Sequence, residues 1–267
     1  MQDARRFELW GRRRDMRISN PFDVLNRILD LLLIILVLLG MLMGLYSIYD
    51  SYLIVREAND SSLLKFKPGY EGPAPERSIE GNMVAWLTVD GTSIDYPVMQ
   101  GQTNEEYLDK DPYGEYSLAG SIFLDSRNAA DFSDGYSLIY GHHMSGDNMF
   151  GPITRFMDQD FFGRHQTGEL TLGDSSYSLL FFAAMKVSAT EDMVFNPTEH
   201  EKTAVLDYIR QHSEVLDENE LDRGFGLRLA ALSTCRYPDT TDRTVVFGYL
   251  ADTGKPVDID SPENEMG

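Results

Sequence analysis

The stretch Leu232–Arg243 reads LSTCRYPDTTDR, and a second strand-like run, RTVVFGYL, begins at Arg243 itself. The apolar residues before this stretch end at Cys235, the only cysteine of the chain, and the turn-forming residues Pro238 and Asp239 follow. Two adjacent strands joined by a short loop are therefore predicted. They would carry the thiol of Cys235 and the guanidinium of Arg243 to the same end of one sheet.

Short apolar runs continue upstream from this pair through most of the chain. They are rich in β-branched and aromatic residues and are separated by turn signals such as Asp90-Gly91. Eight such runs within about 170 residues predict a mainly β fold, either a barrel or a sandwich. The predicted strands are Met83–Val89, Ser93–Met99, Ser121–Asp125, Tyr136–His142, Glu169–Leu172, Tyr177–Val187, Leu227–Cys235 and Thr244–Ala251.

Helices are predicted at the periphery of these strands. Thr198-x-x-Glu201 has the pattern of a capping box, and apolar residues follow it at helical spacing. A helix over Glu199–Leu216 is therefore expected between two late strands. Shorter helices are expected over Met149–Met157 and Asp158–His165.

The N-terminal part of the chain has the pattern of a membrane anchor. Residues 31–49 (LLLIILVLLGMLMGLYSIY) carry no charge and would form a helix about 28 Å long, close to the thickness of a bilayer core. Residues 1–30 hold seven arginines against five acidic residues, which predicts a cytoplasmic N-terminus by the positive-inside rule. The segment lacks a small-residue cleavage site, which disfavours a signal peptide.

The chain after the predicted membrane helix falls into three parts. Residues 50–81 are expected to form an extracellular helix and a linker rich in Pro and Gly, and residues 82–251 the main folded domain. Residues 252–267 form an acidic tail that is expected to be disordered.

The charge of the chain excludes some functions. A net charge of −20 is the opposite of the basic surface that binds nucleic acid, so no nucleic-acid partner is expected. A single cysteine cannot form an internal disulfide. On its count alone it is either a reactive extracellular thiol or a small buried apolar residue.

Taken together, these motifs resemble the sortase family, and its class B branch in particular. A Thr-Cys pair at a strand end, an arginine opening the next strand and an upstream histidine after Tyr-Gly are typical of that family. The class B pattern is matched by GTSIDYPVMQ (Gly91–Gln100), GSIFLD (Gly120–Asp125), IYGHHMSGDNMF (Ile139–Phe150) and the helix before the cysteine strand. The resemblance covers residues 82–251 and implies a closed β-barrel of about eight strands with peripheral helices.

The resemblance implies three catalytic residues and no cofactor or metal. Cys235 would be the nucleophile, His142 the acid/base and Arg243 the stabiliser of the oxyanion. His142 is chosen over His143 because the family histidine directly follows Tyr-Gly. The residue types suit these tasks: a thiolate is a strong nucleophile, an imidazole exchanges protons near neutral pH, and a guanidinium stays charged.

The implied reaction is a transpeptidation at the cell surface of a Gram-positive bacterium. A C-terminal sorting motif of a secreted protein would be cleaved through a thioacyl intermediate. The acyl group would then pass to an amine of the peptidoglycan cross-bridge or of its lipid-linked precursor. The segment Val187–Phe225 is expected to shape the groove that recognises the motif.

Several other interpretations remain open at this point. The chain could polymerise pilins, as some class B sortases do, or act as an extracellular cysteine peptidase that transfers the acyl group to water. It could also be a tethered binding module in which Cys235 is merely buried. A zinc site of Cys235, His142 and His143 lacks a fourth ligand. Asp125, Asp131 and Asp134 lack the regular spacing of a calcium loop, so a solvated loop is expected there.

Overall fold

A computed structural model describes residues 20–79, 81–144, 146–235 and 242–252. Its first helix, α1, spans Pro21–Ala58 and is longer at both ends than the predicted span. The chain up to Ser51 and the chain from Tyr52 onward are two separate compact units. A short 3-10 helix, η1 (Ser61–Phe66), begins after Asp60, whose side chain accepts a hydrogen bond from the backbone N–H of Ser62.

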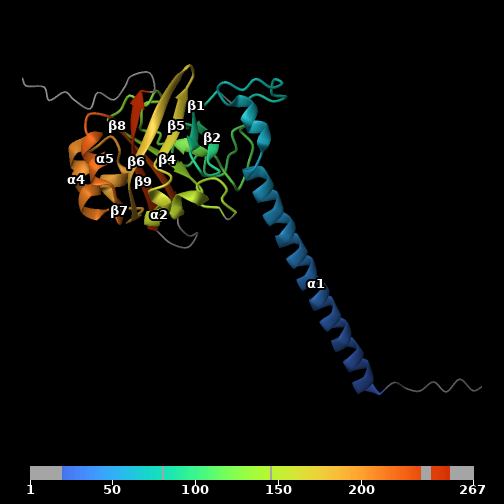
Figure 1. Cartoon of the computed structure of the whole chain (residues 1–267). Helices are drawn as coiled ribbons and strands as arrows, with labels where there is room; N and C mark the ends of the chain where they lie inside the picture. The colour runs from blue at the N-terminus through green and yellow to red at the C-terminus, as the bar shows by residue number, and fades with distance from the viewer. Residues whose placement is uncertain (1–19, 80, 145, 236–241, 253–267) are drawn as a thin grey trace, which may run out of the picture. The chain divides into compact units, whose positions relative to one another are not determined.

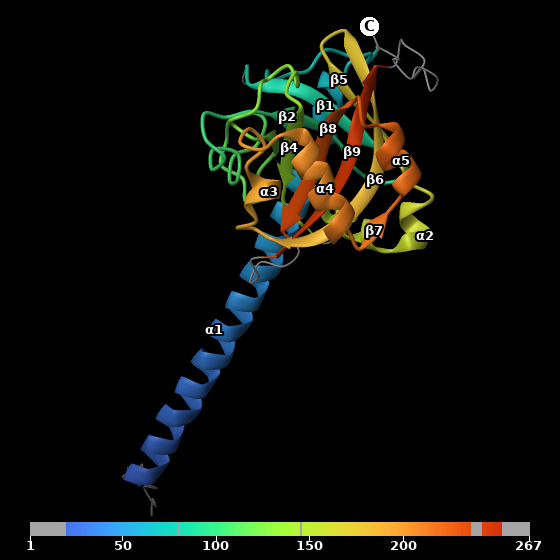
Figure 2. The same ribbon diagram turned by 90° about the vertical axis from the view of Figure 1, so that its left-hand side faces the viewer.

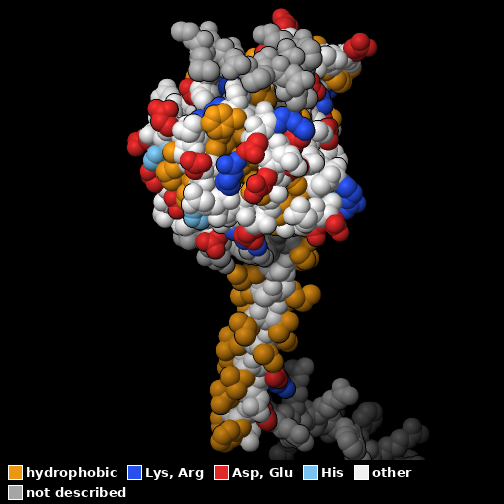
Figure 3. All heavy atoms as spheres, turned by 60° about the vertical axis from the view of Figure 1, so that its left-hand side comes forward, with side chains coloured by type: hydrophobic (Ala, Val, Ile, Leu, Met, Phe, Trp, Pro, Cys, Tyr) orange, Lys and Arg blue, Asp and Glu red, His pale blue; other side chains and the backbone are white. Residues whose placement is uncertain are grey.

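Helix α1 has the composition of a membrane-spanning segment. Figure 3 shows apolar side chains along it, and its most apolar window is 0% buried, with a mean hydropathy of 2.9. Within the described residues, one helix is long and apolar enough to cross a membrane. Asp252, the first residue of the predicted tail, is the last residue of strand β9 (Asp242–Asp252). Residues 253–267 of that tail and residues 1–19 of the predicted N-terminal segment lie outside the described residues.

Eight strands close into a barrel in the part of the chain that the structure describes (Figure 1). The order is β5-β1-β2-β3-β4-β8-β9-β6, and β6 pairs back with β5 to complete the ring. This confirms the predicted closed barrel of about eight strands. The strands are β1 (Met83–Val89), β2 (Asp95–Met99), β3 (Ile122–Leu124), β4 (Tyr136–Gly141), β5 (Thr167–Leu172), β6 (Ser175–Ser188), β8 (Arg228–Cys235) and β9 (Asp242–Asp252).

The barrel is filled by side chains from all eight strands, because alternate residues of each strand point to the same face. In β8, for example, Ala230 and Leu232 face the inner core, whereas Leu229 and Ala231 face outward. The 3-10 helix η2 (Gly151–Met157) adds Ile153 and Phe156 to the inner core. The strands therefore form a rigid scaffold around one apolar centre.

A second core lies on the outer face of β4, β8, β9 and β6. Helices α3 (Asp192–Phe195), α4 (Lys202–His212) and α5 (Glu218–Arg223) supply Val194, Val205, Ile209 and Leu221 to it. Figure 2 shows these helices in front of β6, β8 and β9. Three of the strands beneath this second core, β4, β8 and β9, carry or directly precede the predicted catalytic residues.

The predicted helix over Glu199–Leu216 was wrong at both ends. Helix α4 begins at Lys202, and its N-cap Glu201 makes no side-chain capping bond, so the capping box is absent. The chain around Thr198 instead forms a turn, in which the backbone N–H of Glu199 donates to Asn196 O. Val215 and Leu216 leave the helix and form the short strand β7, which pairs with β6.

The two shorter helices were close to their predicted positions. The segment predicted as Met149–Met157 is the 3-10 helix η2, and the segment Asp158–His165 contains α2 (Gln159–Phe162). Asp158 caps α2 by accepting from the backbone N–H of Phe161. Sequence analysis missed α3 and α5, which are 4 and 6 residues long.

Candidate active site

The three predicted catalytic residues come from three neighbouring strands. Strands β4 and β8 are parallel, and Gly141 pairs with Thr234 at the end of β4. His142 follows Gly141 directly. Strands β8 and β9 are antiparallel, and Cys235 pairs with Arg243. The backbone therefore brings all three positions to one end of the sheet.

The loop that joins β8 to β9 is less fully described. Residues 236–241, with Pro238 and Asp239, lie outside the described residues, as does the side chain of Cys235. The structure therefore gives the position of Cys235 through its backbone pairing alone.

A pocket of about 450 Å³ opens at this end of the sheet. His142 and Arg243 both line it. Apolar side chains make up much of the remaining wall, as is usual in ligand-binding pockets. The other lining residues are Asn104, Glu105, Leu108, Phe123, Tyr140, Gly141, Ala189, Phe195 and Ser233.

The imidazole of His142 is held by the main chain of the loop before β3. Its Nε2 lies 2.6 Å from the carbonyl oxygen of Leu108. A carbonyl can only accept a hydrogen bond, so Nε2 carries a proton in this arrangement. In the neutral ring, Nδ1 is then the nitrogen that can accept a proton.

The close contact between His142 and the carbonyl oxygen of Leu108 requires a glycine at position 120. Its φ of +59° lies in the left-handed region. A Cβ placed there would lie 2.5 Å from Leu108 O, 2.8 Å from Tyr107 O and 3.0 Å from Cδ2 of His142. Gly120 therefore packs directly behind both the catalytic candidate and its hydrogen-bond acceptor.

Arg243 is half-buried in the pocket wall. Burial lowers the pKa of its guanidinium, and the nearby Tyr140 acts in the opposite direction. An arginine keeps its charge under these conditions. The pocket thus holds a fixed positive charge in a partly desolvated place, where its field is stronger than in water.

Tyr140 forms part of the pocket wall. Its ring lies between Phe123, at 5.3 Å between centroids, and Phe195, at 6.5 Å. Its hydroxyl donates to Oδ2 of Asp125 at 3.0 Å. Burial, followed by the charge of Asp125, raises the pKa of Tyr140, so its hydroxyl stays protonated.

His143 differs from His142 in its surroundings. It forms an isolated backbone bridge with Met149 and does not appear among the described residues that line the pocket. Its Nδ1 is buried and has no hydrogen-bond partner among the described residues. Burial lowers the pKa of His143, so its ring favours the neutral form.

Three other histidines lie away from the pocket. His165 stacks on Phe161, and His212 stacks on Tyr208. His200 contacts Asp192 at 2.7 Å. Each ring is engaged locally, and none of the three is among the residues that line the pocket.

Sequence analysis missed several residues of the site. Asn104 and Leu108 belong to a loop to which no role was assigned, and the contribution of Leu108 to His142 is a main-chain carbonyl that any residue could supply. Ala189 and Phe195 belong to the segment Val187–Phe225, which was expected to shape the groove. Tyr140 was visible as part of the Tyr-Gly-His motif, but its role in the wall was not recognised.

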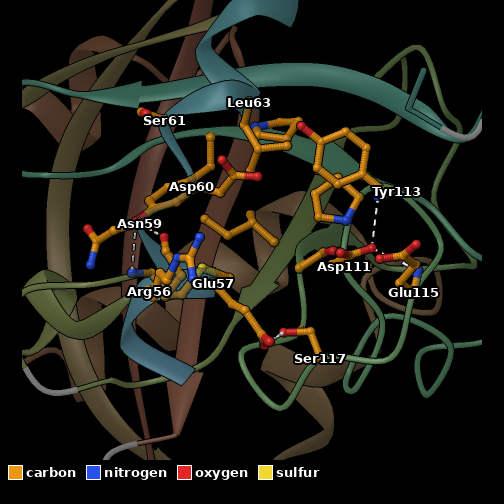
Figure 4. A pocket seen from close by; sticks show the side chains of 18 of the residues that line it. Arg56, Glu57, Asn59, Asp60, Ser61, Leu63, Asp111, Tyr113, Glu115 and Ser117 are labelled. Carbon is orange, nitrogen blue, oxygen red and sulfur yellow. Dashed lines mark hydrogen bonds between the residues drawn. The ribbon is translucent and has the colours of Figure 1, made fainter. Parts of the chain in front are cut away.

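A second cavity, of about 510 Å³, lies between the end of α1, η1 and the loop 111–117 (Figure 4). Glu57 accepts a hydrogen bond from Ser117 at 2.8 Å, and Asp111 accepts from the backbone N–H groups of Tyr113 and Glu115. Burial raises the pKa of Asp111 despite these bonds. The described lining contains neither His142 nor Arg243, so the smaller pocket is the candidate active site.

Comparison with known proteins identifies the family and the fold. The family model of the sortase domain matches residues 87–251, more than half of the chain. The chain is 35% identical to sortase B of Listeria monocytogenes over 184 residues, which are 68% of this chain and 72% of that protein. It is 31% identical to sortase B of Staphylococcus aureus over 176 residues, 64% of this chain and 71% of that protein.

Solved structures agree with the sequence comparison. A Streptococcus pyogenes class B sortase involved in pilus biogenesis superposes with a TM-score of 0.58 at 39% identity, covering 64% of this chain and 94% of that one. The Staphylococcus aureus sortase B–substrate complex gives 0.59 at 30% identity, covering 66% and 82%. The chain therefore belongs to the sortase family, in its class B branch. Sortases are transpeptidases.

Proposed function

We propose that this chain is a membrane-anchored cysteine transpeptidase that joins secreted proteins to the cell wall. The observation that supports this most strongly is the position of three residues at one end of three neighbouring strands. Cys235 pairs with Arg243, and His142 follows the residue paired with Thr234. His142 and Arg243 both line a pocket able to hold a peptide.

In the first step, the thiolate of Cys235 attacks the carbonyl carbon of the sorting motif. A C–S bond forms, and the carbonyl oxygen gains negative charge, which the guanidinium of Arg243 stabilises. The C–N bond then breaks. The leaving amine takes the Nδ1 proton of His142, which enters this step protonated on both ring nitrogens, and a thioester on Cys235 and a neutral imidazole remain.

In the second step, an amine of the cell-wall precursor attacks the thioester. His142 takes the proton of the incoming amine as the new C–N bond forms, and the C–S bond breaks to release the thiolate. Because Leu108 O holds Nε2, the exchanging nitrogen is Nδ1. Water in place of the amine would give hydrolysis, which is the activity of the alternative cysteine peptidase.

The membrane topology is part of the proposal. Helix α1 would cross the membrane once, with the arginine-rich N-terminus in the cytoplasm and the barrel outside. Protease added to intact protoplasts should then remove the barrel. Full protection of the barrel under conditions that digest a known surface protein would contradict this topology.

The reaction itself is tested with Cys235→Ala. Wild-type protein should form a thioacyl adduct on Cys235 with a sorting peptide, detectable by mass spectrometry, and should give a longer product when an amine is added. The Cys235→Ala variant should form neither. An adduct on another residue, or unchanged cleavage in the variant, would overturn the proposal.

Pilin polymerisation is a second candidate, because a compared class B sortase at 39% identity is involved in pilus biogenesis. The two functions differ in the amine that completes the reaction. A pilin polymerase should prefer the side-chain amine of a lysine within a folded protein. An anchoring enzyme should prefer a short peptide amine of the cross-bridge type.

A further inference from the structure

Asp125 is a fully buried carboxylate immediately after β3, although its loop was expected to be solvated. Its side chain is 0% exposed and accepts five hydrogen bonds. The side chain and backbone N–H of Arg127 supply three of them, at 2.8, 2.9 and 3.0 Å. Asn104 Nδ2 and the hydroxyl of Tyr140 supply the other two, at 2.8 and 3.0 Å.

Two of these donors, Asn104 and Tyr140, line the candidate active-site pocket and come from separate segments. Asn104 belongs to the loop before β3, and Tyr140 lies on β4 beside the catalytic candidates. Arg127 extends the network to a third segment, because its guanidinium also donates to the carbonyl oxygen of Phe195 and to Asn196. Asp125 itself is not among the residues that line the pocket.

The network also fixes the orientation of the groups that reach the pocket. Asn104 donates to Asp125 with its Nδ2 and accepts from the backbone N–H of Ser126 at 2.7 Å with its Oδ1, so its amide plane is set at both ends. The hydroxyl of Tyr140 is directed toward Asp125, which keeps the ring between Phe123 and Phe195. One carboxylate therefore aligns three parts of the wall.

The electrostatics favour an ionised carboxylate. Burial alone would raise the pKa of Asp125, but the hydrogen bonds from Arg127 and Asn104 lower it below its ordinary value. Asp125 is therefore charged at neutral pH. Asparagine in its place would keep one acceptor oxygen of the two, so the guanidinium of Arg127 would lose its bidentate partner and the five donors could no longer all be satisfied.

We propose that Asp125 is a positioning residue for peptide recognition, which holds Asn104, Tyr140 and the Phe195 segment in the shape that binds the sorting motif. The proposal rests on the proposed function, because it requires a peptide substrate in this pocket. It does not give Asp125 a role in the chemistry at Cys235. The predicted effect is therefore on KM and not on the reactivity of the thiol.

The test compares Asp125→Asn with Asp134→Asn in the full chain, purified in detergent micelles. Asp134 is a matched control in the same loop: it accepts from Asn128 Nδ2 and from the backbone N–H of Ala129. It is not among the described residues that line the pocket. The probes are the fluorogenic peptide that wild-type protein cleaves best in a library, and iodoacetamide as a small thiol reagent.

Asp125→Asn should raise KM for the peptide about tenfold and leave kcat within about twofold, as expected when binding contacts shared by ground state and transition state are weakened. The rate of alkylation of Cys235 should stay at the wild-type value. Asp134→Asn should show wild-type KM even where its melting temperature falls. Equal changes of KM in both variants, or a loss of kcat with unchanged KM, would overturn the proposal.

A second variant covers the case in which Asp125→Asn fails to fold. Arg127→Lys keeps the positive charge but cannot reproduce the two parallel hydrogen bonds to the carboxylate. Its KM should rise, with normal alkylation of Cys235, and an unchanged KM would contradict the proposal. Failure of the proposed function would look different, because wild-type protein would then cleave no peptide at all.

Discussion

Replacing Gly120 by alanine would test how the loop before β3 holds His142. At a φ of +59°, alanine must adopt a left-handed conformation, which costs about 1–2 kcal/mol. Its Cβ would also lie 2.5 Å from Leu108 O and 2.8 Å from Tyr107 O, both of them backbone atoms that cannot move alone. Overpacking of this kind costs about 1–3 kcal/mol more.

Gly173 provides a matched control for this substitution. Its φ of +54° imposes the same backbone strain, but a Cβ there would meet nothing within 4 Å. Gly173→Ala should therefore lower the free energy of unfolding by about 1–2 kcal/mol. Gly120→Ala should lower it by about 2–5 kcal/mol, the sum of strain and overpacking. Chemical denaturation of both variants measures the difference.

The transpeptidation rate of Gly120→Ala tests whether this loop positions His142. Relief of the clash requires the Leu108 carbonyl or the His142 ring to move, and a displacement of about 1 Å in a catalytic group can cost roughly 100-fold in rate. Transpeptidation should fall by about that factor in Gly120→Ala and stay near wild type in Gly173→Ala. If the two variants differed by less than about 0.5 kcal/mol and had equal rates, the proposed support of His142 by this loop would be refuted.

Three further predictions concern the charged and titrating groups of the site. Arg243→Lys should reduce steady-state transpeptidation by about 10²–10³, because an ammonium cannot reproduce the planar donors of the guanidinium; near-normal activity would reduce Arg243 to a charge partner. His142→Ala should fall at least as far while His143→Ala keeps most activity, and the reverse result would show that the wrong imidazole was chosen. Because the fold lowers the pKa of His143, its contribution to stability is complete above the ordinary histidine value of 6.5 and is lost as pH falls below it. Denaturation between pH 7.5 and 5.5 should therefore show a smaller loss of stability in His143→Gln than in wild type, and equal losses would contradict this.

The barrel could be predicted because its signals are local and repeated. Strands such as Met83–Val89 are predicted at their observed bounds, because a run of apolar and β-branched residues ends at turn-forming residues. The strand β7 was missed because two residues carry no period of their own. The capping box failed because its residues satisfy the pattern equally well in a turn, and the packing of α4 on the sheet decides which one forms.

The position of the predicted catalytic pair could also be derived from the sequence. Two strands joined by a short loop must bring their adjoining ends together, so the sequence predicts that Cys235 and Arg243 lie side by side, and the two residues are paired in the structure. His142 is different: it lies on a strand far upstream, and nothing local indicates that β4 pairs with β8. The family resemblance, and not the spacing, selected it.

The walls of the pocket could not be predicted, because their determinants are pairwise and nonlocal. Asp125 was expected in a solvated loop, since a carboxylate is rarely buried without a partner. Its partners are Arg127, two residues away, and Asn104 and Tyr140, whose proximity depends on the closed barrel. The hydrogen bond from His142 to Leu108 is harder still to foresee, because its acceptor is a main-chain oxygen that every residue possesses. The sequence does contain an indirect sign of this hydrogen bond. Only glycine fits behind it, so Gly120 in GSIFLD marks the place of the backbone contact.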